Sequence, residues 1–170
     1  PSWCQCARRT CTSSHATPSA LTLDTSETAP FCSSQSGVCS GAYVSEYLAI
    51  SHRWEHQEQP DSEGAQTAAI RKFLEERPEI KWVWFDWWCC PQGQRTDADK
   101  ALFFATLGRI NTLYLACTVL VLLDVSYISR FWTGFEAYLA YQQTTPEGLR
   151  PANSTERRCE IVCVHNAEES

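Results

Sequence analysis

Methionine is absent from the 170 residues, and the chain begins with proline. We therefore expect the sequence to be a piece of a longer protein, whose targeting signals cannot be read from these residues. The length favours a single domain with a core of its own. The apolar and charged fractions, 44% and 20%, are ordinary for a soluble globular protein.

Long apolar runs, excess positive charge and phosphate-binding motifs are also absent. The most apolar stretch, residues 113–125, holds about a dozen apolar residues, whereas a helix needs roughly 20 to cross a bilayer. This stretch therefore predicts a buried strand and no membrane span. The net charge of −6 excludes a general basic footprint for nucleic acid. No GxGxxG, Walker A or nucleophile-elbow pattern occurs, which argues against those nucleotide-binding loops and that hydrolase nucleophile.

Cysteine, in contrast, is abundant: there are ten, and five lie within the first 39 residues. The other five lie on or beside predicted strands, where a free thiol behaves as a small hydrophobic group. A chain this rich in core residues differs from a small secreted disulfide scaffold, so we expect a reduced, cytoplasmic protein. Cys4, Cys6, Cys11 and His15 lack the usual zinc spacings, and no metal site is expected.

Tryptophan is concentrated in residues 81–92, KWVWFDWWCCPQ, which hold four of the seven in the chain. The β-prone run stops after Asp86 at a Cys-Cys-Pro-Gln turn, which predicts a buried strand with a carboxylate at its end. Two interpretations stay open. Either the stretch is simply a tryptophan-rich core strand, or Asp86 and the following loop belong to a site at the carboxyl end of the strand.

Strand and helix patterns alternate along the rest of the chain. Strands are predicted at residues 47–50, 80–86, 118–124 and 159–164, and helices at 65–77, 98–115 and 129–142. This order predicts an α/β fold, a flavodoxin-like three-layer sandwich with a parallel sheet of about four or five strands. The domain spans residues 41–165. Residues 1–40 are predicted to be an irregular or disordered lead-in, 144–158 a polar loop and 166–170 a frayed tail.

Local signals refine two of the helices. Thr96 and Asp99 have the spacing of a capping box at the start of the second helix. Ser129 is a plausible N-cap for the third, whose predicted apolar stripe consists of Ile128, Phe131, Phe135 and Leu139. Residues 51–55, 86–92 and 124–129 all follow predicted strands, so they would meet at one edge of a parallel sheet and form a single site.

Three segments resemble the motifs of heterokaryon incompatibility (HET) domains, in the same order. They are YLAISHRWE from Tyr47, WFDWWCCPQ from Trp84 and SRFWTGFEAYLA from Ser129. The resemblance covers residues 47–141. The chain departs from the family pattern at His52, at Glu55 in place of Gly, at Cys90-Pro91 and at Phe135.

HET domains are similar in turn to TIR domains, and Ser129-x-x-Trp132-x-x-x-Glu136 is similar to the TIR helix that carries the catalytic glutamate. The resemblance implies a cytoplasmic signalling domain in a cell-death or innate-immune response that oligomerises on activation. It also implies an NAD⁺ glycohydrolase, with NAD⁺ as substrate and no cofactor.

Glu136 is the expected catalytic residue, because a carboxylate can stabilise the oxocarbenium-like centre formed at the ribose. The expected substrate-binding residues are Ser51, His52, Arg53, Trp54, Asp86 and Trp132. Trp132 would stack on a base, Arg53 would meet the pyrophosphate, and Asp86 would orient Arg53 or a ribose hydroxyl.

Structural interpretations compete with these roles. Trp54 and Trp132 would be core anchors, Asp86 a cap and Glu136 a solvated helix residue. Cys89 has no placed histidine partner and is not expected to be a nucleophile. The alternative function is a non-enzymatic, self-associating signalling scaffold, with exposed Trp and Phe side chains forming its interface.

Overall fold

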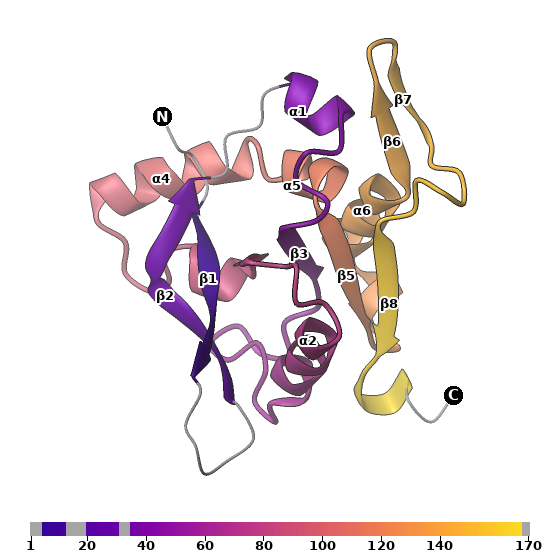
Figure 1. Ribbon diagram of the computed structural model, residues 1–170. Coiled ribbons are helices and arrows are strands. Elements are labelled where there is room, and N and C mark those ends of the chain that lie inside the picture. Colours follow the sequence, from indigo (N-terminus) through magenta and orange to yellow (C-terminus); the bar gives the residue numbers. More distant parts are fainter. Residues whose placement is uncertain (1–4, 13–19, 31–34, 168–170) are drawn as a thin grey trace.

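The computed structural model describes residues 5–12, 20–30 and 35–167, and its main element is a six-stranded sheet of order β2-β1-β4-β3-β5-β8 (Figure 1). Four neighbouring strands are parallel: β4 (Trp82–Trp84), β3 (Tyr47–Ser51), β5 (Thr118–Leu123) and β8 (Cys159–Cys163). An antiparallel hairpin, β1 (Gln5–Thr12) and β2 (Ala20–Pro30), extends the sheet beyond β4. The predicted α/β class is confirmed.

Helices connect the parallel strands. The short helix α1 (Gln35–Cys39) precedes β3, and α2 (Ala65–Glu75) joins β3 to β4. Three helices lie between β4 and β5: α3 (Asp86–Cys89), α4 (Asp97–Leu107) and α5 (Asn111–Ala116). The 3-10 turn η1 (Tyr127–Ser129) and α6 (Phe131–Ala140) follow β5, and η2 (His165–Ala167) follows β8. No helix in the described ranges is long and apolar enough to cross a membrane.

The sheet separates two apolar cores, because successive side chains of a strand point to opposite faces. Leu48 and Ile50 of β3 pack with Ile70 of α2 on one face. Ala49, between them, packs on the other face with residues of α5 and α6, such as Leu113. Helices therefore cover both faces of the parallel strands, an arrangement compatible with an α/β sandwich.

The guanidinium of Arg158 ties α5 to α6 inside the second core. It is buried, and it donates to the carbonyl oxygens of Tyr114 and Cys117 at the end of α5, at 2.5 and 2.8 Å. It also donates to that of Leu139, near the end of α6, and to that of Gln142, just beyond this helix, at 3.0 and 3.1 Å. One side chain thus satisfies the last carbonyls of two helices, where a positive charge is favourable.

The N-terminal prediction requires correction, because β1, β2 and α1 lie within the residues expected to be irregular. The physical reason is a partner that local pattern does not reveal: β1 pairs with the edge of β4, and β2 then pairs with β1. Cys4 and His15 lie outside the described residues, as does the end of the predicted tail after Ala167.

Three boundaries also differ from prediction. The helix expected over 98–115 is divided into α4 and α5, with Gly108 at the end of α4. The polar loop expected over 144–158 contains a hairpin of β6 (Gln142–Thr145) and β7 (Gly148–Pro151), because Gly148 adopts a φ of 134° at the turn. Asp86 begins α3 rather than ending β4.

The predicted start of α6 is wrong, and its predicted stripe is right only at Phe135 and Leu139, which pack in or against the core. Arg130 is the N-cap, and the Ser129 hydroxyl donates instead to the Ser126 carbonyl. Ile128 and Phe131 are 78% and 75% exposed, although Leu139 is buried as predicted. The inward face of α6 instead runs through Thr133, Glu136 and Ala140, which are spaced three and four residues apart.

Candidate functional site

A cavity of about 380 Å³ lies where β3 and β4 end, bounded on the other side by α4 and α6. Its wall includes two carboxyl groups, three guanidinium groups and three large aromatic rings. They belong to Asp86 and Glu136, to Arg53, Arg95 and Arg130, and to Trp54, Phe103 and Trp132. The connection from β3 to β4 packs on one face of the sheet, and the connection from β4 to β5 packs on the other. Open α/β folds place their ligands at the carboxyl ends of the strands where the chain changes faces in this way.

The structure brings the predicted site residues together. His52, Arg53 and Trp54 follow β3, Asp86 opens α3, and Trp132 and Glu136 lie on α6; all six line the cavity. Ser51 is completely buried behind the wall, where it contacts Glu136. Residues separated by up to 85 positions thus meet, because parallel strands deliver their carboxyl ends to one edge.

The Glu136 carboxyl is held from behind by a chain of hydroxyl groups. Ser51 Oγ donates to Glu136 Oε2 at 2.6 Å and lies 2.5 Å from the Tyr127 hydroxyl. Tyr127 in turn donates to the Thr133 carbonyl at 3.0 Å. This chain of hydrogen bonds ends on the Thr133 carbonyl, and the hydroxyl protons within it can point either way. It can therefore donate to the ionised Glu136 carboxyl or accept from the protonated one.

Burial raises the pKa of Glu136 to about 7, and the negative charge of Asp86 acts in the same direction. Hydrogen bonds from Ser51 and Tyr114 and the nearby His52 oppose this rise in the pKa. The carboxyl therefore exchanges its proton close to neutral pH, as a group that acts in proton transfer or charge stabilisation would need to do.

Asp86 has a different environment, in which donors surround both oxygens. Oδ1 lies 2.8 Å from His52 Nε2 and accepts the Trp87 backbone N–H at 2.6 Å. Oδ2 accepts the Trp54 indole N–H at 2.8 Å. The expectation that Asp86 orients Arg53 is wrong.

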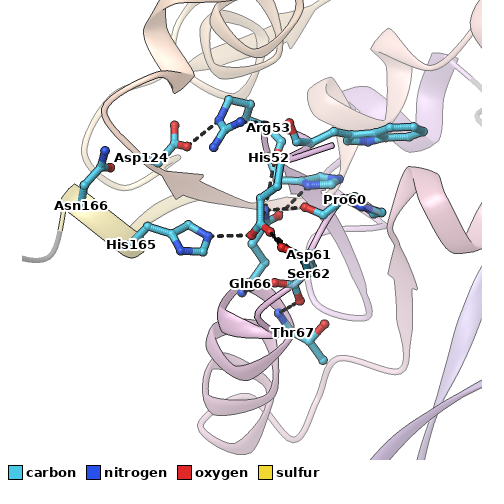
Figure 2. A network of polar contacts seen from close by, with 12 residues as sticks. His52, Arg53, Pro60, Asp61, Ser62, Gln66, Thr67, Asp124, His165 and Asn166 are labelled. Carbon is cyan, nitrogen blue, oxygen red and sulfur yellow. Dashed lines mark hydrogen bonds and ion pairs between the residues drawn. The ribbon is translucent and has the colours of Figure 1, made fainter. Parts of the chain in front are cut away.

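Arg53 is oriented by Asp124, which follows β5 (Figure 2). Its Nε donates to Asp124 Oδ2 at 2.5 Å, and its Nη1 donates to the Trp54 carbonyl at 3.0 Å. Asp124 is buried, and the hydrogen bond from Arg53 satisfies one of its two carboxylate oxygens. The charge of Arg53 is thus balanced locally, which leaves Arg95 and Arg130 to meet an anionic ligand.

The aromatic wall corrects the interpretation of Trp132 as a core anchor. Trp132 is 65% exposed while lining the cavity. Trp54 is half-buried and contacts Trp87 edge-on at 5.1 Å between ring centroids. The Arg95 guanidinium lies 4.0 Å from the centre of the Phe103 ring, a cation–π contact. Exposed rings beside guanidinium groups suit a planar, phosphate-bearing ligand.

A cysteine nucleophile is disfavoured at this site. Cys90 lines the cavity, but burial and the charge of Asp86 raise the pKa of its thiol to about 12. A thiol, rather than the reactive thiolate, is therefore present at neutral pH. Among the residues with described side chains, no cluster of His, Cys, Asp or Glu could hold a metal ion.

Glu55, one of the departures from the HET pattern, supports the loop behind the cavity. It accepts from the Ser62 backbone N–H at 2.7 Å and from the Ser62 hydroxyl at 2.5 Å, and it lies 2.8 Å from His165 Nε2. Burial acts to raise the pKa of Glu55, but these contacts outweigh it and lower the pKa. A glutamate here connects η2 to the loop after β3.

Sequence reasoning missed several residues of the site. Gln66 and Tyr127 lie behind the wall, and Arg95, Phe103 and Arg130 are part of it. Arg95 could have been found, since it lies in the loop that follows the predicted strand end. Nothing in the pattern of α2 distinguishes Gln66 from a surface glutamine, because only the folded chain places it against His52.

Comparison of the chain with protein-family models, with characterised proteins and with solved structures found no match.

Proposed function

We propose that the cavity binds NAD⁺ and that the protein hydrolyses the nicotinamide–ribose bond, as a HET/TIR-like signalling domain in a cell-death or immune-type response. The observation that carries this proposal is the Glu136 carboxyl, which lines the cavity with a pKa of about 7. The parallel strands have the spatial order second, first, third, fourth in the chain, which supports a flavodoxin-like, TIR-like architecture.

In the proposed reaction, the bond between ribose C1′ and the nicotinamide nitrogen breaks, and nicotinamide leaves with the electron pair. A positive charge develops at C1′, and water then adds there and releases a proton, giving ADP-ribose. The ionised Glu136 accepts a hydrogen bond from a ribose hydroxyl and stabilises the positive charge. The site excludes bulk water in part, which strengthens this attraction.

The rest of the wall provides contacts for the other parts of NAD⁺. Trp132 offers an exposed aromatic face for a base. Arg130 is exposed, and no ion pair joins it or Arg95 to a carboxylate among the described residues. Their guanidinium groups suit the pyrophosphate. The cavity volume lies within the usual range for small-molecule sites.

The proposal is tested by incubating the purified protein with NAD⁺, at high protein concentration and with a crowding agent, while nicotinamide release is measured. We expect release by the wild type and a loss of at least about 100-fold in Glu136→Gln, which keeps the shape but removes the charge. Glu147→Gln changes an exposed glutamate and serves as the matched control. Circular dichroism checks the fold, and unchanged release by Glu136→Gln would remove the catalytic assignment.

A second candidate function, a non-enzymatic self-associating scaffold, is favoured by one observation. Large apolar side chains of η1 and α6 are exposed, namely Ile128, Phe131, Trp132 and Tyr138. Such a patch is typical of an interface. Wild-type protein that assembles but releases no nicotinamide at any concentration would support the scaffold and contradict the enzyme.

A further inference from the structure

The hydrogen bonds around His52 restrict where its protons lie. The ring is buried and stacks on Phe85, with 4.2 Å between ring centroids. Nδ1 lies 2.7 Å from Gln66 Oε1, and Nε2 lies 2.8 Å from Asp86 Oδ1. Both ring nitrogens thus face an oxygen at hydrogen-bonding distance, and the charge state of the ring follows from what these oxygens can donate.

The amide of Gln66 has only one orientation that satisfies its neighbours (Figure 2). Its Nε2 donates to the carbonyl oxygens of Arg53 and Pro60, at 3.0 and 2.9 Å, and it lies 3.4 Å from Glu55 Oε1. Turning the amide over would place its oxygen against these acceptors. Oε1 must therefore face His52, and because Oε1 only accepts, His52 Nδ1 carries a proton.

With one proton fixed on Nδ1, a second proton is needed for a hydrogen bond between Nε2 and Asp86. A neutral ring would direct the lone pair of Nε2 at a carboxylate oxygen. Asp86 also accepts from Trp54 and from the backbone of Trp87, which favours the carboxylate over the protonated acid. The arrangement that satisfies every contact is an imidazolium paired with a carboxylate.

We propose that Gln66 holds His52 as an imidazolium that cancels the charge of Asp86, so that the cavity attracts an anionic ligand. The charged groups around His52 are Asp86 on α3, Glu136 on α6 and, across Gln66, Glu55 in the loop before α2. His52 and Gln66 are positioning residues, because they act through Asp86 and through the Trp54 indole that Asp86 holds.

The charge of His52 affects the net charge of the cavity wall. Asp86 is balanced by His52, and Arg53 by Asp124. Glu136 then faces Arg95 and Arg130, so the wall is positive in either protonation state of Glu136. A phosphate-bearing nucleotide should therefore bind more tightly than the corresponding nucleoside. This preference rests on the proposed function, whereas the charge of His52 does not.

Nitrogen NMR of the histidine side chains tests the charge directly, without any ligand. The chain has four histidines, and a His52→Gln variant identifies the signal of His52. At about pH 7.5, where a solvated imidazole is mostly neutral, we expect two similar ring-nitrogen shifts for His52, as in a doubly protonated ring. A neutral pattern for His52 would overturn the proposal, and so would the absence of a doubly protonated signal among the four wild-type histidines, even if no variant folds.

The variant Gln66→Met removes the acceptor and should convert His52 to the singly protonated pattern. Arg71→Met, an exposed change on the same helix, is the control and should leave the signal unchanged. A doubly protonated His52 in folded Gln66→Met would overturn the role of Gln66.

Calorimetric titration with AMP and adenosine tests the preference for an anionic ligand. We expect AMP to bind the wild type more tightly than adenosine, and its Kd to rise about tenfold in Gln66→Met. Equal affinities of the wild type for the two ligands would overturn the electrostatic consequence. Failure to bind either ligand, with His52 doubly protonated, would contradict the nucleotide site and leave the His52 assignment standing.

Discussion

Burial of the Glu136 carboxyl affects stability as well as reactivity. The pKa is raised from 4.5 to about 7 in the folded protein, so this group's favourable contribution is present below about pH 4.5 and is lost as the pH rises through about 7. Glu136→Gln removes that loss. We expect the variant to be more stable than the wild type by about 1–3 kcal/mol at pH 8, with little difference near pH 5.

Urea unfolding at the two pH values measures the effect, with Glu147→Gln as the exposed control. A Glu136→Gln variant whose advantage does not change with pH would show that the carboxyl is not desolvated in the folded state. Gain of stability with loss of activity is common where a site holds a strained or desolvated group.

Single residues show how far sequence reasoning reached. Asp86 was placed at the site because it follows a strand end in an α/β pattern, whereas Glu136 was placed there because its segment resembles the TIR helix that carries the catalytic glutamate. Their partners were not predictable, since Asp86 lies with His52 and Trp54, and Arg53 with Asp124. Such pairings depend on angles between elements, which periodicity does not determine.

At the scale of elements, Arg158 joins the carboxyl ends of α5 and α6. Arg158→Met would leave four buried carbonyl oxygens without this donor. We expect the free energy of unfolding to fall by about 3 kcal/mol, because each unsatisfied buried acceptor is costly even after partial relaxation. Arg157→Met, at the exposed neighbouring position, is the control and should change stability by less than about 0.5 kcal/mol. Equal stability of the two variants would show that the helix ends do not depend on Arg158.

One of the two local cap signals was right, since Ser129 is not the N-cap of α6, and elements that depend on distant partners were not predicted. The capping box formed by Thr96 and Asp99 is confirmed, since both of its hydrogen bonds form within four residues. The helix expected after it ends at Gly108 and resumes as α5, because α5 packs into the core beside α6 whereas most of α4 is exposed. The hairpin β1–β2 was missed because its strands need the edge of β4.

At the scale of the whole molecule, β3 and β5 are the central strands of the parallel sheet and lie between the two cores. We expect their backbone amides to exchange with solvent most slowly, because exposing them requires loss of both cores. The hairpin β6–β7 is separate from this sheet, and its strand β7 is exposed along its length, so the amides of the hairpin should exchange much faster. Hydrogen exchange followed by mass spectrometry measures the order. Protection in β6–β7 equal to that in β3 would contradict this distribution of stability.

Glu136 is the proposed reacting carboxylate, and the pH dependence of nicotinamide release tests that role most directly. Measured from about pH 5 to about pH 9, kcat/KM should rise through about 7, because only the ionised carboxyl stabilises the developing positive charge. In Ser51→Ala the rise should move to higher pH, because the hydrogen bond from Ser51 lowers the pKa of Glu136. A rate that does not change with pH in this range, or a rise that stays in place in Ser51→Ala, would contradict the account.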